Sequence, residues 1–445
     1  MNASSAAPLA VIAGLGKTGL SCARHLASRG WRLACTDSRP EPPGLAELHR
    51  AVPAATVRTG ELDARVLEGA ALVVASPGLP LQQPLFAAAR ARGIEVVGDV
   101  ELFAREAASP VVAITGTNGK STVTTLVGDM ARRAGWDVRV GGNLGTPALD
   151  LLGGAPRLYV LELSSYQLES TSTLRLVAGA VLNLTPDHMD RYAGMEDYAA
   201  AKARIFAHCG TAVVNLDDAW AAAMPRAGQR VVGFSVEGHP DAEWSLVPHD
   251  GAQWLANAGE PLVALADLRI AGRHNAANAL AALAVGEAAG IPREAMLGAL
   301  REFAGLPHRS QWVRERRGVR WLDDSKGTNV GATLAAVQGL PGTLVLLAGG
   351  DGKNQDFAPL ADALRGRVRL AVLIGRDARR LGAALAGACD VAFAQSMEEA
   401  VAAAAAAAQP GDTVLLSPAC ASLDMFRDYA HRGVVYADAV RELEP

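Results

Sequence analysis

Short runs of valine, isoleucine and leucine alternate with alanine-rich segments of helical length along almost the whole chain. Strands that are buried on both faces have such unbroken apolar runs, and the longer segments between them have the length of crossover helices. The alternation therefore predicts an α/β protein with mainly parallel sheets. Changes along the pattern separate three blocks, which we expect to be domains spanning residues 1–98, 99–305 and 306–445.

The length and charge of the chain exclude several classes of protein. At 445 residues it is too long for one hydrophobic core and predicts two or three domains. A net charge of −4 without a basic tract argues against nucleic acid as a partner. No apolar run has the length of a membrane span. The initial run "AAPLAVIAGLG" leads directly into a glycine turn, which indicates a first strand rather than a signal peptide.

The cysteines indicate a reducing compartment. Their number is odd, and no two of them form a C-x-x-C pair. Disulfide frameworks and zinc sites are recognised by such pairs or by even counts. We therefore expect free thiols, no zinc site and a cytoplasmic location. The five are Cys22, Cys35, Cys209, Cys389 and Cys420.

The stretch "VVAITGTNGKSTVTTL", residues 111–126, resembles a phosphate-binding loop but departs from the G-x-x-x-x-G-K-[ST] spacing, because Ile114 stands where the first glycine belongs. The physical requirements of such a loop are nevertheless met. An apolar strand is followed by a turn with Gly116 and Gly119, and a helical run begins near Ser121. Lys120 would reach the terminal phosphates, and the Ser121 hydroxyl would bind Mg²⁺. A plain strand-turn-helix joint is the alternative, and Lys-Ser-Thr at the turn makes a phosphate site the better interpretation.

A second glycine-rich turn lies near the N-terminus. Gly14, Gly16 and Gly19 form G-x-G-x-x-G after a strand, and Asp37 follows at the distance of a ribose-binding acid. This pattern alone predicts an NAD- or FAD-dependent oxidoreductase. A UDP-linked sugar presents the same pyrophosphate to the same helix N-terminus, so the N-terminal block does not decide between the two.

Polar residues that follow buried strands supply the candidate chemistry of the second block. Glu162 ends the apolar run in "YVLELSSYQLE", where an acid is costly unless it is paired or binds a metal. A structural ion pair is the alternative for Glu162. The loop "TPDHMDRY" contains Asp187, His188 and Arg191 at the carboxyl end of a strand, where α/β sites form. Together, Ser121, Glu162 and His188 would hold Mg²⁺ close to the γ-phosphate of ATP.

Further candidates come from single residues in ordinary contexts. Lys202 in "YAAAKARIF" would normally be a solvated helix lysine, but a desolvated lysine there would lose its proton more easily. In "AGRHNAANALAAL", Asn275 would cap a helix and Asn278 would face a base. The third block carries polar loops after three strands, "WLDDSKGTN", "AGGDGKNQDF" and "LLSPACASLDMF". These loops predict a second substrate pocket facing the ATP site.

Taken together, these stretches resemble the Mur ligase family over nearly the whole chain. The segment "TGTNGKST" is shared with the wider superfamily, including folylpolyglutamate synthases, and identifies only the class. The "DNPR"-type signature of ligases that add a diamino acid is absent, which favours the branch that adds glutamate. The branch is identified by the order of "GLGKTGLS", "ASPGL", "GDVELF", "GGNLGTPAL", "ELSSYQLE", "DHMDRY", "GLPHR", "DDSKGTN", "GGDGK" and "SPACASLD".

The resemblance implies a Rossmann-like N-terminal domain, a central P-loop-type ATPase domain and a Rossmann-like C-terminal domain. The implied reaction joins D-glutamate to UDP-MurNAc-L-Ala with ATP, through an acyl phosphate, in peptidoglycan precursor synthesis. The implied cofactors are ATP, two Mg²⁺ ions and CO₂ as a lysine carbamate, and we expect a monomer. The sequence leaves open whether the amino acid is D- or L-glutamate, since the two differ only in pocket geometry.

The resemblance also implies a role for individual residues. ATP phosphates would lie on Gly116, Thr117, Asn118, Gly119, Lys120, Ser121 and Thr122, and the adenosine on Asn278, Arg309 and Asp324. The UDP-sugar would be held by Lys17, Thr18, Asp37, Arg39, Gly78 and Asn143. The metal ligands would be Ser121, Glu162, His188 and carbamylated Lys202. D-Glutamate would contact Thr328, Lys353, Ser422, Leu423 and Tyr429. The catalytic residues would be Lys120, His188, Lys202 and Lys326.

Two alternatives remain beside the ligase. The oxidoreductase explains only the first forty or so residues of the chain. An inactive binding protein with the same fold would be expected to have lost Lys120, Glu162, His188 or Lys202, and all four are present.

Overall fold

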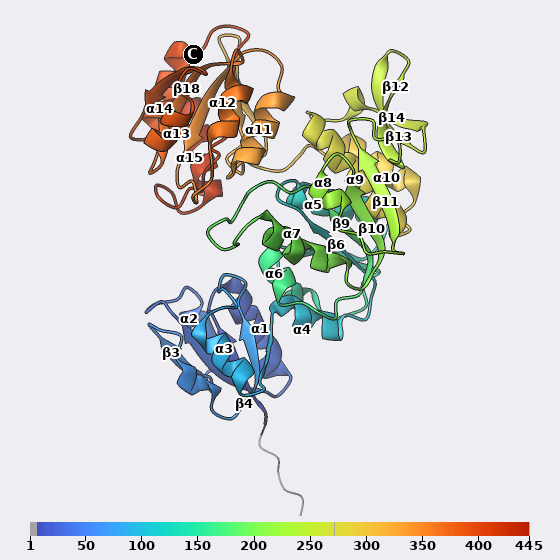
Figure 1. The fold of residues 1–445 in the computed structure, drawn as a ribbon, viewed down its shortest axis with the longest axis vertical. Coiled ribbons are helices and arrows are strands. Elements are labelled where there is room, and N and C mark those ends of the chain that lie inside the picture. The colour runs from blue at the N-terminus through green and yellow to red at the C-terminus, as the bar shows by residue number, and fades with distance from the viewer. Residues whose placement is uncertain (1–6, 271, 445) are drawn as a thin grey trace, which may run out of the picture.

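The computed structural model describes residues 7–270 and 272–444, so the ends of the first and third predicted blocks (residues 1–6 and 445) lie outside it. Three sheets divide the chain, as Figure 1 shows, and most of their strand pairs are parallel. The predicted α/β class is therefore confirmed. Each sheet lies within one of the three blocks, while the boundaries after residues 98 and 305 stay predictions.

The N-terminal domain is a five-stranded parallel sheet with strand order β3-β2-β1-β4-β5. Its strands are β1 (Leu9–Ala13), β2 (Arg32–Asp37), β3 (Thr56–Thr59), β4 (Ala70–Ala75) and β5 (Glu95–Val97). Its helices are α1 (Lys17–Ser28), α2 (Leu45–Ala51), α3 (Pro84–Ala91) and the 3₁₀ turn η1 (Ala64–Leu67). Alternate residues of β1 pack into two different clusters, Ile12 in one and Val11 in the other, which explains its unbroken apolar run.

The central domain is built on a nine-stranded sheet with order β14-β13-β12-β11-β10-β9-β6-β8-β7. Neighbouring strands in the series β7-β8-β6-β9-β10-β11-β12 pair in parallel. The pairs β12–β13 and β13–β14 are antiparallel. This antiparallel extension was not predicted, because its strands mix apolar and polar residues. The strands are β6 (Val111–Thr115), β7 (Val138–Gly142), β8 (Leu158–Glu162), β9 (Leu176–Val181), β10 (Cys209–Asn215), β11 (Arg230–Ser235), β12 (Trp244–His249), β13 (Ala252–Asn257) and β14 (Glu260–Ala264).

Helices cover both faces of the parallel part of this sheet. The helices are α4 (Asp99–Glu106), α5 (Lys120–Arg133), α6 (Ser165–Glu169), α7 (Met195–Ala203), α8 (Ala219–Ala222), α9 (Arg273–Ala288) and α10 (Arg293–Glu302), with 3₁₀ turns η2 (Ala148–Leu151), η3 (Arg204–Phe206) and η4 (Leu265–Asp267). Along β6, Val112 and Ile114 pack with α5, α9 and α10, whereas Val111 and Ala113 pack with α4, α6 and η3. The carboxyl ends of β6, β8 and β9 consequently lie at one edge, between the two helical layers.

The C-terminal domain has a six-stranded sheet with order β15-β16-β20-β17-β18-β19, in which only the β15–β16 pair is antiparallel. Its strands are β15 (Gln311–Arg316), β16 (Val319–Asp323), β17 (Leu344–Gly349), β18 (Val368–Ile374), β19 (Asp390–Phe393) and β20 (Thr413–Leu416). Its helices are α11 (Val330–Gly339), α12 (Ala358–Leu364), α13 (Ala378–Ala384), α14 (Met397–Ala407) and α15 (Tyr429–Glu442). Because β16, β20 and β17 are neighbours, the loops that follow them meet at one edge, as predicted.

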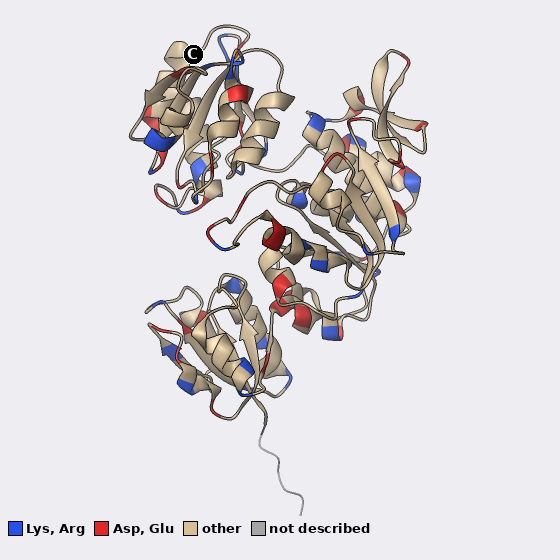
Figure 2. Cartoon of the chain, viewed as in Figure 1, with Lys and Arg blue, Asp and Glu red and all other residues tan. Residues whose placement is uncertain are grey.

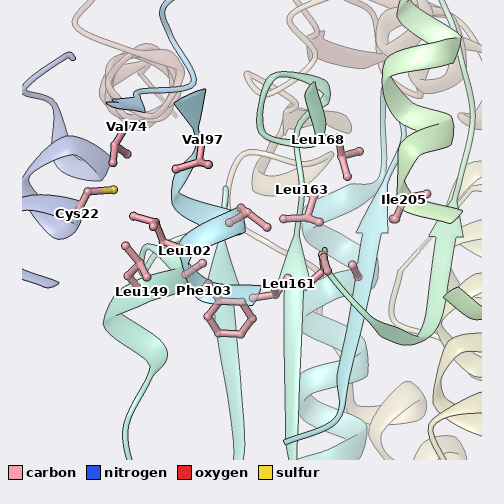
Figure 3. Close-up of a cluster of buried hydrophobic side chains, with 14 of the residues drawn as sticks. Cys22, Val74, Val97, Leu102, Phe103, Leu149, Leu161, Leu163, Leu168 and Ile205 are labelled. Carbon is pink, nitrogen blue, oxygen red and sulfur yellow. The ribbon is translucent and has the colours of Figure 1, made fainter. Parts of the chain in front are cut away.

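One hydrophobic cluster is continuous between the N-terminal and central domains (Figure 3). Cys22 and Val97 of the first domain belong to the same buried cluster as Leu102, Phe103 and Leu149 of the second. The rings of Phe103 and Tyr159 meet edge to face at 5.1 Å. Shared apolar burial of this kind holds two domains in a defined orientation.

Lysine and arginine are interspersed with aspartate and glutamate over all three domains (Figure 2). Within the described ranges, the five cysteines are free thiols. No helix in that part of the chain is long and apolar enough to cross a membrane.

Candidate active site

The phosphate-loop sequence joins β6 to α5, as predicted. Gly116 and Gly119 have φ angles of 143° and 84°, which other residues rarely adopt. Among the described residues, no side chain caps the N-terminus of α5, so its first N–H groups are available to an anion. Lys120 lies over the loop, where its Nζ donates to the carbonyls of Gly116 at 2.9 Å and Thr117 at 2.7 Å. This arrangement suits phosphate oxygens that carry negative charge.

Asn183, which follows β9, holds the phosphate loop in place by hydrogen bonds. Asn183 accepts from the backbone N–H of Asn118 through its Oδ1 at 2.8 Å and from Thr117 through its carbonyl at 2.9 Å. The Thr117 hydroxyl is 3.2 Å from the Tyr198 hydroxyl. Asn183 was not among the predicted site residues, because its partners lie 65 positions away in the chain.

Glu162 ends β8 beside this loop with 3% of its surface exposed. Asn143 donates its Nδ2 to Glu162 Oε1 at 2.6 Å. The other oxygen, Oε2, is buried and has no hydrogen-bond partner among the described residues. The alternative of a structural ion pair for Glu162 is not supported, because no cation lies within ion-pair distance of it in the described chain. An unpartnered buried carboxylate oxygen fits a cation that binds there.

Lys202, on α7, is 1% exposed, which excludes the solvated-lysine alternative. Its Nζ donates to the Gly116 carbonyl at 2.9 Å and lies 4.6 Å above the Tyr198 ring. Burial and then the nearby Lys120 lower the pKa of Lys202 well below its ordinary value, against the opposing effect of Asp187 and Glu162. A lysine in this environment readily becomes a neutral amine.

His188 lies in the loop between β9 and α7, which reaches toward the C-terminal domain (Figure 1). Its φ of 59° is a left-handed conformation. Burial lowers the pKa of His188 to about 4, although Asp187 acts in the opposite direction. The imidazole is therefore neutral at pH 7 and able to bind a metal or accept a proton.

The predicted metal ligands form a mixed set. In the part of the chain that the structure describes, no three His, Cys, Asp or Glu side chains form a group that could hold a metal ion. The unpartnered Glu162 Oε2 fits Mg²⁺, which prefers oxygen ligands, and the neutral imidazole of His188 adds a nitrogen lone pair, a less usual ligand for this ion. The Lys202 amine fits only if it is converted into an oxygen ligand, because a protonated amine would repel the ion and a neutral amine nitrogen is a poor ligand for Mg²⁺.

A pocket of about 390 Å³ lies between the central and C-terminal domains. It is lined on the central side by Asn118, Gly119, Thr122 and Asn278, and on the other side by Arg309, Asp324 and Lys326. A Cβ atom on Gly119 would be 2.2 Å from Asn278 Oδ1, so Asn278 lies directly against the phosphate loop. The alternative of Asn275 as a helix cap is wrong, since α9 begins at Arg273 and Gly272 is its N-cap.

Asp324 and Arg309 line the same pocket. Burial raises the pKa of Asp324 to about 7, although Ser417 Oγ and Ser310 N donate to it at 2.8 and 3.1 Å. Burial also lowers the pKa of Arg309, and Glu162 and Asp324 oppose that effect.

The predicted D-glutamate residues lie on the three adjacent loops of the C-terminal sheet. Thr328 follows β16, Lys353 follows β17, and Ser422 and Leu423 follow β20. Ser422 is buried, whereas Leu423 is 73% exposed. Tyr429 begins α15, and its ring lies 3.8 Å from Lys326 Nζ. Burial lowers the pKa of Lys326 to about 8, assisted by Arg309 and Lys120.

Two residues without a predicted role connect these loops to the central domain. Asp187 Oδ1 accepts from Lys353 Nζ at 3.3 Å, and Asp187 Oδ2 accepts from Asn329 Nδ2 at 3.3 Å. Asn329 also exchanges amide hydrogen bonds with Asn118. Both residues lie in polar loops quoted above, "TPDHMDRY" and "DDSKGTN", but roles were predicted for their neighbours in those loops instead.

The glycines of the N-terminal turn have different functions. Gly14 has a φ of 93°, and a Cβ on Gly19 would be 1.8 Å from the Gly14 carbonyl oxygen, so both are required by the fold. By contrast, no described atom lies within 4 Å of the place where a Cβ on Gly16 or Gly78 would stand. Open space above two glycines of ordinary backbone conformation fits a ligand that approaches the main chain.

Asp37 accepts four hydrogen bonds, from Leu15 N at 2.7 Å and from Arg39 N, Nε and Nη2 at 2.9, 2.9 and 2.7 Å. Burial opposes its ionisation, but the bonds from Arg39 and Leu15 outweigh it and lower the pKa to about 2. Four donors fill the acceptor positions of a carboxylate. Asp37 therefore orients Arg39, which does not fit the ribose-binding role suggested by the dinucleotide pattern. Lys17 and Thr18 lie in the first turn of α1, and Lys17 Nζ donates to the Gly145 carbonyl at 2.5 Å.

Comparison with protein families gives three matches along the chain. Residues 9–98 match the Mur ligase MurD-like N-terminal domain, residues 114–286 the Mur ligase middle domain, and residues 308–420 the Mur ligase glutamate ligase domain. The oxidoreductase alternative is not supported, because the match covers the glycine-rich turn on which it depended.

Curated relatives match over nearly their full length. The UDP-N-acetylmuramoylalanine--D-glutamate ligase of Nitrosococcus oceani is 54% identical over 440 residues, which cover 98% of this chain and 97% of the relative. The enzyme of the same name from Pseudomonas aeruginosa is 51% identical over 437 residues, covering 97% and 98%.

Solved structures with low identity share the fold. MurF from Acinetobacter baumannii has a TM-score of 0.64 at 19% identity, covering 98% of this chain and 92% of that one. The UDP-N-acetylmuramate-alanine ligase MurC from Thermotoga maritima has a TM-score of 0.61 at 18% identity, covering 98% and 99%.

Proposed function

Because this chain belongs to the Mur ligase family, we propose that it uses ATP to join D-glutamate to UDP-N-acetylmuramoyl-L-alanine, with release of ADP and phosphate, in peptidoglycan precursor synthesis. The observation that carries the proposal is the unpartnered, buried Glu162 oxygen beside an uncapped phosphate loop. Relatives at about half identity over the full length, named as D-glutamate ligases, support the choice of amino acid.

The chemistry requires activation of a carboxylate, which is a poor electrophile. The alanyl carboxylate attacks the γ-phosphorus of ATP, ADP leaves, and an acyl phosphate forms. The N-terminus of α5 and Lys120 would bind the phosphate oxygens and offset the repulsion between the anions. Mg²⁺, held by Ser121, Glu162 and His188, would supply further charge neutralisation of the phosphates.

Lys202 is proposed to be carbamylated. Its neutral amine would add CO₂ to give a carbamate, which turns a cation into an oxygen ligand suited to Mg²⁺. The lowered pKa of Lys202 favours the free amine that this addition needs. A ¹³C signal of a carbamate after incubation with labelled bicarbonate, absent in Lys202→Met, is the expected result.

The amine of D-glutamate then attacks the acyl carbon, loses a proton and displaces phosphate. The acceptor of that proton would be a phosphate oxygen, or His188, neutral at pH 7, at a stage when its free ring nitrogen does not bind Mg²⁺. Lys353 and Lys326 would pair with the glutamate carboxylates, together with Thr328 and the turn at Ser422 and Leu423. Tyr429 would border the D-glutamate pocket with its ring, over which the Lys326 ammonium lies.

The two nucleotides are assigned to different sites. The adenosine of ATP would occupy the pocket lined by Asn278, Arg309 and Asp324. The UDP-sugar would lie over Gly16 and Gly78, with Arg39 held toward it by Asp37 and with Lys17 and Thr18 at the start of α1. We expect a cytoplasmic location, since ATP and nucleotide sugars are cytoplasmic substrates, and we also expect a monomer.

Phosphate release from ATP with UDP-N-acetylmuramoyl-L-alanine tests the proposal directly. Release with D-glutamate, but not with L-glutamate or meso-diaminopimelate, is expected. Release with another amino acid would keep the ligase reaction and change its specificity. No release with any of them, from folded protein with Mg²⁺ and bicarbonate, would refute the proposed function.

A further inference from the structure

Arg191 connects the loop that carries His188 to the N-terminal domain. Its Nη1 donates to the carbonyl of Pro77 at 2.9 Å, and its Nη2 lies 3.4 Å from the carbonyl of Leu79. These two carbonyls flank Gly78, the exposed glycine with open space above it. One side chain of the central domain therefore holds, from both ends, the backbone turn where the UDP-sugar is proposed to bind.

The guanidinium of Arg191 is itself held in one position. It stacks over the Tyr166 ring at 3.8 Å from the centroid, and its Nη2 pairs with Glu169 Oε2 at 3.1 Å. The Tyr192 hydroxyl donates to the other oxygen of Glu169. Only 10% of the Arg191 side chain is exposed, so these contacts are shielded from water. A planar guanidinium can stack and donate in two directions at once, which a lysine ammonium cannot.

The ring beneath Arg191 also contacts the candidate catalytic loop. Tyr166 lies 4.9 Å from the His188 ring, centroid to centroid, at a tilt of 59°. Tyr166 belongs to α6, which begins three residues after Glu162 and is fixed by a capping box between Ser164 and Gln167. The imidazole of His188 and the Gly78 turn are thus joined through the Tyr166 ring and Arg191, and Glu162 precedes that ring by four residues in the chain.

The hydrophobic cluster shared by the two domains sets their overall orientation, but among the described residues it includes none of the turn from Pro77 to Leu79. The two charge-assisted hydrogen bonds from Arg191 to backbone carbonyls are directional, so they fix the position of that turn more closely than apolar packing would. Binding residues must be held to within a fraction of an ångström for a substrate carboxylate to meet its partner.

We propose that Arg191 is a positioning residue for the sugar nucleotide: stacked on Tyr166, it sets the Pro77–Leu79 turn so that the bound UDP-sugar directs its carboxylate toward Glu162 and His188. This inference rests on the proposed function. It assigns to Arg191 the alignment of the first substrate with the site, and no contact with ATP or with D-glutamate.

The variant Arg191→Lys tests the inference, because it keeps the charge and removes the fork of donors. The KM for the UDP-sugar is expected to rise about tenfold or more, the loss of one to two charge-assisted hydrogen bonds, while the KM values for ATP and D-glutamate stay within about twofold. The affinity for UDP alone, measured by calorimetry, is expected to fall in parallel, which gives a readout independent of turnover.

Arg204→Lys is the matched control. Arg204 also donates to two backbone carbonyls, Leu168 at 2.7 Å and Thr171 at 2.7 Å, but both belong to the central domain. Its replacement is expected to leave the KM for the UDP-sugar and the affinity for UDP unchanged. If Arg191 had a purely structural role, its replacement would raise all three KM values together. The KM for the UDP-sugar would then also rise in Arg204→Lys.

Either unchanged UDP affinity in Arg191→Lys or an equal rise in all three KM values would overturn the inference. If that variant does not fold, Glu169→Gln, which weakens the hold on the guanidinium and keeps its shape, is expected to give a smaller rise in the same KM. Failure of the unsubstituted protein to release phosphate would instead refute the proposed function, and the two failures are thereby distinguished.

Discussion

Asn118 of the phosphate loop and Asn329 of the C-terminal domain exchange two side-chain amide hydrogen bonds, at 3.1 and 3.3 Å. Asn329 is also the N-cap of α11, where its Oδ1 accepts from Ala332 N at 2.8 Å. The helix that borders the pocket between the two domains on one side therefore starts from a direct contact with the loop on the other side. A movement of the C-terminal domain away from the phosphate loop would therefore break these two hydrogen bonds.

Replacing Asn329 by serine separates the cap of α11 from the contacts that the Asn329 side chain makes with Asn118 and Asp187 of the central domain. Serine keeps the cap of α11 but is too short to exchange bonds with Asn118. We expect kcat/KM for ATP and for D-glutamate to fall by about tenfold, the loss of roughly one to two neutral hydrogen bonds, with little change in Tm. Steady-state kinetics and thermal unfolding check this result. Unchanged kinetics together with an unchanged Tm would show that the asparagine acts only as a cap, a function that serine retains.

Replacing Asn143 by alanine tests whether this residue supports metal binding or UDP-sugar binding. Its Nδ2 lies 2.6 Å from Glu162 Oε1, so it orients the carboxylate proposed to bind Mg²⁺. In Asn143→Ala, the Mg²⁺ concentration at half-maximal activity is expected to rise about 10–100-fold, as for other residues that orient metal ligands. A Mg²⁺ titration measures this. A rise in the KM for the UDP-sugar alone would assign Asn143 to the sugar nucleotide.

Gly78→Ala tests whether the open space above this glycine belongs to a ligand. The new Cβ meets no described atom, so the Tm is expected to stay the same or rise slightly. The KM for the UDP-sugar is expected to increase, because the methyl group occupies the approach to the backbone. Gly19→Ala is the contrasting variant. Its Cβ would stand 1.8 Å from the Gly14 carbonyl oxygen, so it should destabilise the fold itself.

Lys202→Met should remove activity and increase stability at neutral pH. The folded protein depresses the pKa of Lys202, so below the unfolded value of 10.5 the unfolded chain binds the extra proton and is favoured. Methionine has no such penalty, and the Gly116 carbonyl keeps Lys120 as a donor. We expect a higher free energy of unfolding for the variant at pH 7 in CO₂-free buffer. The difference should shrink as the pH rises toward the unfolded pKa, which urea unfolding at several pH values measures. An equal difference at every pH would contradict the depressed pKa.

The strands and the phosphate loop could be predicted because their signals are local. An unbroken apolar run, a glycine turn and a Lys-Ser pair follow one another within a few residues, as in β6 and the start of α5. The polar loops after β16, β17 and β20 could likewise be expected at one sheet edge, because parallel strands end on the same side. The antiparallel strands β12 to β14 lacked such a signal, since their residues alternate irregularly in polarity.

The sequence by itself determined the fold class, the chemistry of the loops and, through the order of its motifs, the family. Only the tertiary structure decided which polar groups meet. Asn118 and Asn329 are 211 positions apart, and Arg191 and Pro77 are 114 apart, so no local pattern records either contact. The same holds for burial, which turns Lys202 from an ordinary helix lysine into a group with a depressed pKa. Solvation and long-range contact depend on the packing of whole domains, and these properties separate a reactive residue from an identical one on the surface.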